Sequence, residues 1–246
     1  MTPGESLPPI HLIVLAGGRS TRARHGDATA PKQFRYVGRR MLFMIAVQEL
    51  LEVPEVVSLT VAVPDPWRAV AEIVLDEQKL RCPVQLASAG PHRTASTWNA
   101  LQAVAQGLGP EPDHLVAIHD AARPFASHHL LRRVAAAATS GEGGAVPGVA
   151  VADTIVQLVD GPDESAAAAT YLERSVLQAV QTPQVFRWEP LLAAHRWADE
   201  HRQPFTDDGG LMAARGLPPL VVMGEQENWK ITTEDDWDRA ETLLCR

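Results

Sequence analysis

Short apolar runs alternate with helical patterns along most of this chain, and no other feature constrains the fold as strongly. The strand-type runs are 10–16 (IHLIVLA), 56–63 (VVSLTVAV), 84–88, 114–119 (HLVAIH) and 145–151. The helical patterns between them are 41–52, 67–79, 95–106 and 127–139. Strands that alternate with helices predict an α/β fold, with a mostly parallel sheet and helices on both of its faces.

Three local signals set the expected helix boundaries. The Asp65–Pro66 pair predicts the N-cap and first turn of the helix over 67–79, and Ser127 predicts the N-cap of the helix over 127–139. Gly107 predicts the end of the helix over 95–106, since glycine commonly follows the last helical residue.

Residues 152–181 interrupt the alternation. The strand-type run 154–159 is followed by a turn signal at 160–162 and an alanine-rich stretch, which together predict a β-arm that projects from the sheet. Arms of this kind often exchange between subunits. After it, helices are expected at 188–201, 207–214 and 233–245 and a strand at 220–223. We find no fixed-period repeat and no long linker, so we expect one domain over 1–246.

Composition excludes several classes of function. The chain has 22 Lys and Arg against 30 Asp and Glu, a net charge of −8, whereas binding to nucleic acid requires a basic face. The apolar runs are shorter than the roughly 20 residues of a membrane helix. No Lys or Arg precedes the first apolar run, as it would in a secretory signal, so a cytoplasmic protein is expected. Cys82 and Cys245 match neither a metal site nor a disulfide framework.

A glycine-containing loop directly follows the first strand. Gly17 and Gly18 allow the backbone to approach an anion, and Arg22 and Lys32 bring positive charge nearby. The spacing matches neither G-x-G-x-x-G nor G-x-x-x-x-G-K-[ST], which argues against a Rossmann-type redox enzyme and an ordinary ATPase. Open α/β sheets bind ligands at the carboxyl ends of their strands, so a phosphate site is expected here. The alternative is a solvated basic loop.

Four segments resemble one enzyme family. Residues 17–34 resemble the signature of nucleotidyltransferases that couple a nucleoside triphosphate to a sugar or polyol phosphate. Residues 119–124 (HDAARP), 181–186 (QTPQVF) and 228–235 (NWKITTED) resemble segments of the 2-C-methyl-D-erythritol 4-phosphate cytidylyltransferases and of the related ribitol-5-phosphate cytidylyltransferases. The order and spacing of the segments fit this family from about residue 10 to residue 244.

The resemblance implies a fold, an activity and an assembly. The fold would be a Rossmann-like sheet of the nucleotide-diphospho-sugar transferase type, and the protein would be a homodimer joined through the arm at about 152–181. The activity would be Mg²⁺-dependent transfer of the cytidylyl group of CTP to 2-C-methyl-D-erythritol 4-phosphate, with release of pyrophosphate. That reaction belongs to non-mevalonate isoprenoid precursor synthesis.

The resemblance also implies a role for each matching position. The catalytic cations would be Arg22, Lys32 and Lys230. The nucleotide would contact Ala16, Gly17, Gly18, Gly90, Arg93, Ser96 and Asp120, and Asp120 would also hold Mg²⁺. The acceptor would contact Arg123, Thr154, Arg174, Thr182 and Thr206. Of these, Thr154 and Arg174 would reach the partner subunit's site from the arm.

These cations suit the implied chemistry. A phosphate monoester and a triphosphate repel each other strongly at contact distance in a site of reduced dielectric. The catalyst therefore needs fixed cations and a metal rather than a base, because a phosphate dianion is already a competent nucleophile. Catalysis would consist of positioning and of electrostatic stabilisation of an in-line displacement.

The chain departs from the family pattern in three segments. Arg19 stands where glycine is usual, Pro91 replaces an acidic residue, and Gly209–Gly210 replace Ala-Ser. The identity of the acceptor is therefore open, with ribitol 5-phosphate or another phosphate or phosphonate as alternatives. A non-catalytic, nucleotide-binding regulator is the alternative from a different class.

Overall fold

A mostly parallel sheet forms the centre of the protein. The structure is a computed structural model that describes residues 7–18, 30–158 and 169–244. In this part of the chain the sheet has eight strands in the order β10-β7-β11-β6-β1-β4-β5, with β12 also paired to β7. The strands are β1 (Ile10–Leu15), β4 (Val56–Val63), β5 (Val84–Ser88), β6 (Leu115–Asp120), β7 (Ala145–Ala150), β10 (Gln178–Val180), β11 (Gln184–Arg187) and β12 (Leu220–Met223). Only the pairings of β10 and β11 are antiparallel within it.

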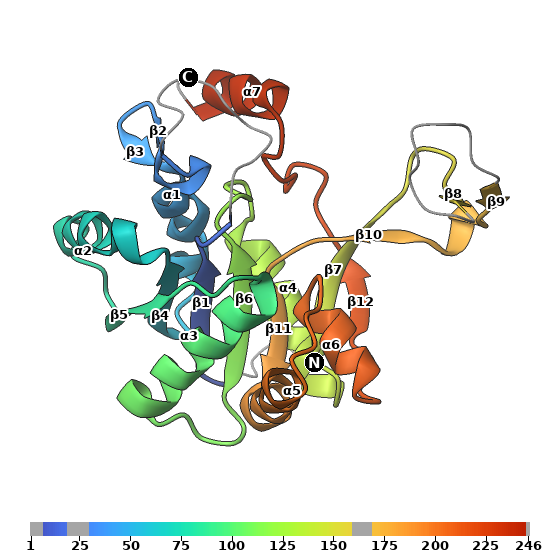
Figure 1. The fold of residues 1–246 in the computed structure, drawn as a ribbon, viewed down its shortest axis with the longest axis horizontal. Coiled ribbons are helices and arrows are strands. Elements are labelled where there is room, and N and C mark those ends of the chain that lie inside the picture. The colour runs from blue at the N-terminus through green and yellow to red at the C-terminus, as the bar shows by residue number, and fades with distance from the viewer. Residues whose placement is uncertain (1–6, 19–29, 159–168, 245–246) are drawn as a thin grey trace.

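Helices cover both faces of this sheet, as the alternating pattern predicts (Figure 1). The helices are α1 (Leu42–Gln48), α2 (Arg68–Glu77), α3 (Arg93–Leu108), α4 (His128–Ser140), α5 (Trp188–Glu200), α6 (Asp208–Ala214) and α7 (Glu234–Leu244). Leu12 and Val14 of β1 share one buried cluster with α1, α2 and α4, whereas Ile13 and Leu15 share the other with α3, α5 and α6. Alternate residues of a strand point to opposite faces, so β1 is buried on both sides.

A third, smaller cluster joins residues 37–45 to the C-terminal segment. The short hairpin of β2 (Tyr36–Val37) and β3 (Arg40–Met41) follows a 3₁₀ turn at Lys32–Phe34. Val37 of this hairpin packs with Ile231 and with Trp237 of α7. Figure 1 shows α7 beside this hairpin, above the carboxyl end of the sheet. The contact fixes the segment that carries Lys32 next to the segment that carries Lys230.

Two predicted helix boundaries are wrong. Asp65 lies in a 3₁₀ turn (Asp65–Trp67) before α2, and its side chain accepts a hydrogen bond from Ser88 Oγ at 2.7 Å instead of capping the helix. Helix α3 continues through Gly107 to Leu108, and the next residue, Gly109, has a φ of 54°, the left-handed conformation that favours glycine. The predicted cap at Ser127 is confirmed, since its side chain accepts a hydrogen bond from the Leu130 N–H.

The arm is present but is shorter than predicted. Strand β8 (Val156–Leu158) pairs antiparallel with β9 (Ala169–Tyr171), and the pair projects from the body (Figure 1). Strand β10 already belongs to the central sheet, so the predicted arm over 152–181 includes part of that sheet. The predicted turn at 160–162 lies outside the described residues. None of the helices described is both long and apolar enough to cross a membrane.

Candidate active site

A pocket of about 710 Å³ opens at the carboxyl ends of the parallel strands. The loops after β1, β4 and β5, the last residue of β6 and the segment before α7 surround it. Its lining includes Gly17, Gly18, Lys32, Gly90, Arg93, Ser96, Asp120 and Lys230. Sequence analysis places a ligand site at this edge of the sheet, and the pocket lies there.

The base of the pocket is built by close contact between two loops. An added Cβ at Gly17 would lie 2.4 Å from Cβ of Ala89, and one at Gly90 would lie 2.5 Å from Cβ of Ala95. No side chain fits at either position without moving its neighbours. Ser96 holds the second loop, because its Oγ accepts from the Gly90 N–H at 3.0 Å.

Asp120 forms the charged centre of the pocket. Its side chain is only 13% exposed, and Lys230 Nζ donates to its Oδ2 at 2.7 Å. Arg93 Nε lies 3.4 Å from its Oδ1. Burial alone would raise the pKa of this carboxyl, but the charges of Arg93 and then Lys230 hold the pKa well below its usual value. Asp120 is therefore ionised, and two cations offset its charge.

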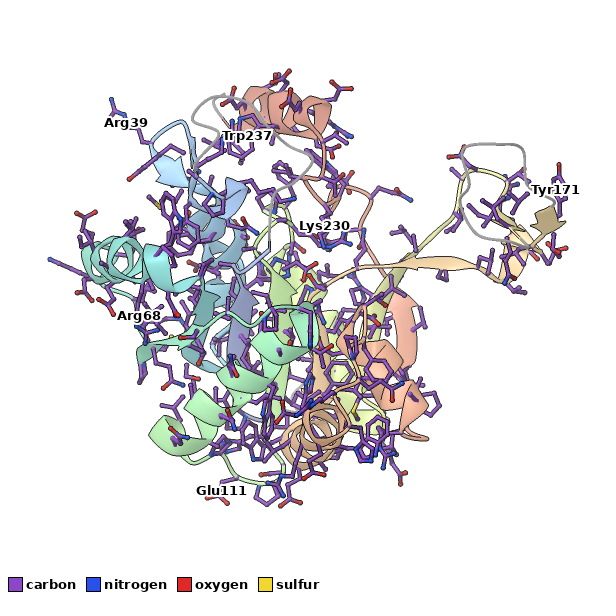
Figure 2. The ribbon with its side chains drawn as sticks, viewed as in Figure 1. Arg39, Arg68, Glu111, Tyr171, Lys230 and Trp237 are labelled. Atoms are coloured by element: carbon purple, nitrogen blue, oxygen red, sulfur yellow. The ribbon has the colours of Figure 1, made fainter. Side chains whose placement is uncertain are left out.

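Lys32 reaches the same pocket from the opposite end of the chain. Its ammonium donates to the backbone carbonyl of Ile231, one residue after Lys230. The neighbouring Gln33 donates to the Gly18 carbonyl at 3.3 Å, which ties the 3₁₀ turn to the glycine loop. Figure 2 labels Lys230 over the body of the protein, between the sheet and α7. The two lysines thus line one cavity although they are far apart in sequence.

Two residues expected to contact the acceptor make hydrogen bonds that brace the site. Arg123 donates to the Asn228 carbonyl at 2.8 Å and to the Val180 carbonyl at 3.4 Å, and it does not line the pocket. Burial lowers the pKa of this guanidinium, and the charge of Asp120 opposes that shift. Thr182 is 4% exposed, and its hydroxyl accepts from the Asp120 N–H at 3.0 Å.

His119 completes this bracing. Its Nε2 donates to the Arg123 carbonyl at 2.9 Å, so its Nδ1 accepts from the Thr182 hydroxyl at 3.0 Å. This arrangement requires a neutral imidazole, and burial lowers the pKa of His119 to about 4. The HDAARP and QTPQVF segments therefore hold the backbone that presents Asp120.

The remaining predicted residues lie in different places. Ala16 is fully buried and lies outside the pocket wall, whereas Gly18 and Ser96 line the pocket. Thr206 is exposed just before α6. Thr154 and Arg174 are exposed on the arm, where Arg174 donates to the Ala152 carbonyl at 2.6 Å. Arg22 lies outside the described residues.

Sequence analysis missed several buried polar residues. Gln184 accepts from the backbone N–H groups of Asp208 and Gly209, both at 3.1 Å, and so anchors the start of α6. Asp208 and His195 are buried together behind the pocket wall. The two glutamines of the QTPQVF segment are the one available signal, because amides are unusual in a buried strand and need partners. His195 has no such signal.

The pocket does not offer Mg²⁺ a complete set of protein ligands among the described residues. Among residues 7–18, 30–158 and 169–244, no group of three or more His, Cys, Asp or Glu side chains could hold a metal ion. Asp120 is one suitably placed carboxylate. Mg²⁺ commonly binds through one or two carboxylates together with substrate phosphates and water. The residues therefore fit an ion that enters with a triphosphate.

Comparisons with known proteins agree on one family. Residues 10–246 match the family model described as 2-C-methyl-D-erythritol 4-phosphate cytidylyltransferase. One similar curated protein, the bifunctional enzyme IspD/IspF of Nitrobacter winogradskyi, is 36% identical over 234 residues, which cover 95% of this chain and 55% of that protein. The chain spans about half the length of the curated relatives it matches.

Solved structures share the fold. The 2-C-methyl-D-erythritol 4-phosphate cytidylyltransferase of Thermus thermophilus is 28% identical, with a TM-score of 0.71 and coverage of 97% of this chain and 100% of that one. The 4-diphosphocytidyl-2C-methyl-D-erythritol synthase of Anaerococcus prevotii has a TM-score of 0.78 at 22% identity, with coverage of 97% of both chains.

Proposed function

Since the chain belongs to the 2-C-methyl-D-erythritol 4-phosphate cytidylyltransferase family, we propose that it transfers the cytidylyl group of CTP to 2-C-methyl-D-erythritol 4-phosphate. The products are the CDP-polyol and pyrophosphate, within non-mevalonate isoprenoid precursor synthesis. The observation that carries the proposal is that Lys32, Lys230 and Asp120 line one and the same pocket at the carboxyl edge of the sheet. The proposed setting is the cytoplasm, where nucleoside triphosphates are available.

The two lysines account for the group transfer. An acceptor phosphate oxygen attacks the α-phosphorus of CTP, and the bond from that phosphorus to the bridging oxygen breaks as pyrophosphate leaves. Lys32 and Lys230 offset the repulsion between the two anions and stabilise the charge on the α-phosphoryl oxygens. Arg22 is proposed to act with them. Positioning in line supplies the remainder of the rate enhancement.

The nucleotide is proposed to lie against the two glycine loops. Gly17 and Gly90 allow the backbone at the base of the pocket to pack closely, and the nucleotide is proposed to lie there beside Ala16, Gly18 and Ser96. Arg93 and Asp120 line the wall of this part of the pocket. Mg²⁺ is the proposed cofactor, held by Asp120 and by phosphate oxygens, where it would neutralise charge on the triphosphate. The Lys230 ammonium would then leave the Asp120 carboxylate and pair with a phosphate.

The acceptor is proposed to bind between two subunits. Thr154 and Arg174 belong to the arm, and we assign them to the acceptor side of the partner's site. Arg123, Thr182 and Thr206 are assigned to the acceptor side of their own subunit's site. Tyr171 and Val176 on the arm are 75% and 76% exposed, and apolar side chains left this open favour contact with a second copy. Tyr171 lies at the far end of the arm in Figure 2. Residues 1–246 would act as one domain, and the arm would join two copies.

The Gly17→Ala variant tests the proposed nucleotide contact. The added methyl group would lie 2.4 Å from Cβ of Ala89, so the two loops must separate. We expect the Kd for CTP to rise by about 5- to 100-fold, the range that overpacking costs imply. Isothermal titration calorimetry measures this change. Gly18→Ala is the comparison, with a smaller expected effect, because its nearest neighbour is the end of the Gln33 side chain at 2.9 Å. Equal Kd values for wild type and Gly17→Ala would contradict the contact.

Pyrophosphate release tests the function itself. We expect turnover with CTP, Mg²⁺ and 2-C-methyl-D-erythritol 4-phosphate, and a much lower rate with ribitol 5-phosphate or with UTP in place of CTP. Turnover with ribitol 5-phosphate alone would reassign the acceptor. CTP binding without turnover of any acceptor phosphate would support the alternative of a non-catalytic, nucleotide-binding regulator and overturn the proposal.

A further inference from the structure

A series of polar side chains, each in contact with the next, leads from the interior of the protein to the pocket wall. His195 of α5 is fully buried, and its Nε2 donates to Oδ1 of Asp208 at 3.0 Å. Asp208 is the first residue of α6 and is 1% exposed, and its Oδ2 accepts from NH1 of Arg93 at 2.6 Å. Arg93 is the first residue of α3, and its Nε faces Oδ1 of Asp120 at 3.4 Å. Neither His195 nor Asp208 lines the pocket.

The Asp208 carboxylate is costly to bury and is held by several partners. Transferring a charged group out of water is strongly unfavourable unless that group is paired and hydrogen-bonded. Burial alone would raise its pKa, but the charge of Arg93 and the hydrogen bond from His195 bring the pKa below its usual value. Gln184 fixes the same residue through its backbone N–H at 3.1 Å. The proposed transfer reaction uses neither Asp208 nor His195 directly.

From this geometry we infer that His195 and Asp208 are positioning residues, which hold the Arg93 guanidinium in place for the nucleotide. The inference rests on the proposed function, because it assigns Arg93 to the CTP side of the pocket. Each member of the chain orients the next one. His195 occupies one oxygen of Asp208, so the other oxygen is directed at Arg93.

Arg93 needs this support because its second contact is weak. The guanidinium is held at 2.6 Å by Asp208, whereas its contact with Asp120 is 3.4 Å long. An arginine side chain loses considerable rotamer entropy when it is fixed. Without Asp208 the guanidinium would occupy several conformations, and CTP would have to order it on binding. That ordering cost weakens CTP binding and leaves acceptor binding unaffected.

Kinetics of matched variants provide the test. We expect Asp208→Asn and His195→Leu each to raise the KM for CTP by about tenfold, with the KM for the acceptor within about twofold of wild type. His195→Gln keeps a donor near the position of Nε2, so it should restore most of the affinity. The matched control is His11→Leu, which removes another buried histidine, 4% exposed and bonded to Ser58 at 2.8 Å near the opposite end of β1. It should lower Tm and leave both KM values unchanged.

A ligand-free measurement separates this inference from the proposed function. The Nε–H resonance of Arg93, assigned by its loss in Arg93→Lys, should exchange slowly with solvent in wild type and in His11→Leu. It should broaden or exchange rapidly in Asp208→Asn and His195→Leu, recorded at a temperature where circular dichroism shows both to be folded. Should Asp208→Asn not fold, the His195 variants give the result.

The outcomes distinguish the two claims. Unchanged Arg93 exchange in the folded variants, or a KM for CTP equal to that of the His11→Leu control, would overturn the positioning role. If the exchange pattern is as expected but the wild-type protein does not bind CTP, the proposed function is overturned. The part of the inference that concerns Arg93 is then still supported.

Discussion

Replacing Lys32 with alanine is expected to lower kcat by about 10²- to 10³-fold, the usual effect of removing one charge-stabilising donor from a transition state. The KM for CTP should change much less, because the lysine acts on charge that develops during the reaction. The fold should survive, since Lys32 is only half-buried and loses one hydrogen bond to the Ile231 carbonyl, worth about 0.5–1.5 kcal/mol. Pyrophosphate release and the thermal midpoint give both quantities.

Two comparison variants make this result specific. Arg39→Ala removes the same unit charge from the turn of the neighbouring hairpin, where the side chain is exposed and points away from the body (Figure 2). It should leave kcat unchanged, whereas Lys32→Arg should retain part of the activity because it keeps the charge. If Lys32→Ala turns over at a rate close to that of Arg39→Ala, Lys32 has no part in the transfer step.

The second large effect concerns the arm. Arg174→Ala is expected to lower kcat/KM for the acceptor by about 10²-fold, as loss of a charged partner from a phosphate would do, with the Kd for CTP nearly unchanged. The arm projects from the body, so Arg174 should act in the partner's pocket (Figure 1). Light scattering should accordingly report a dimer, and a wild-type monomer with full activity would rule out this arrangement.

Mixing two inactive variants tests which subunit Arg174 serves. A dimer of one Lys32→Ala chain and one Arg174→Ala chain has one pocket with an intact body and an intact arm. Random exchange between equal amounts of the two variants should therefore restore about a quarter of wild-type activity, because half of the dimers carry one working site of two. If Arg174 acted in its own subunit, both pockets of the mixed dimer would be defective and no activity would return.

Local sequence patterns predict the strands and the position of the pocket better than they predict the buried residues behind the pocket wall. The apolar runs predict β1 and β4 nearly to the residue, because strands buried on both faces need continuous apolar sequence. The rule that ligands bind at the carboxyl edge of such sheets then predicts that Gly17 and Lys32 line one pocket. The resemblance to a family adds Lys230, which no local pattern connects to the first strand.

Residues that act through tertiary contacts could not be predicted in this way. His195 lies on the buried face of an ordinary amphipathic helix, and only the packing of α5 against α6 gives it Asp208 as a partner. Thr182 shows a different difficulty. A threonine hydroxyl can contact a substrate phosphate or hold a backbone N–H, and the sequence does not distinguish these uses. In the structure, this hydroxyl accepts from the Asp120 N–H.

The contact between Lys32 and the carbonyl of Ile231 has a consequence for synthesis on the ribosome. When translation has reached Gly224, all eight described strands of the central sheet have been made. Such a nascent chain lacks Lys230, the carbonyl that holds Lys32, and the helix that packs on the hairpin of β2 and β3. Nucleotide affinity should therefore arise only once the ribosome has added residues 230–244, and nucleotide binding by stalled nascent chains would report that step rather than the formation of the sheet.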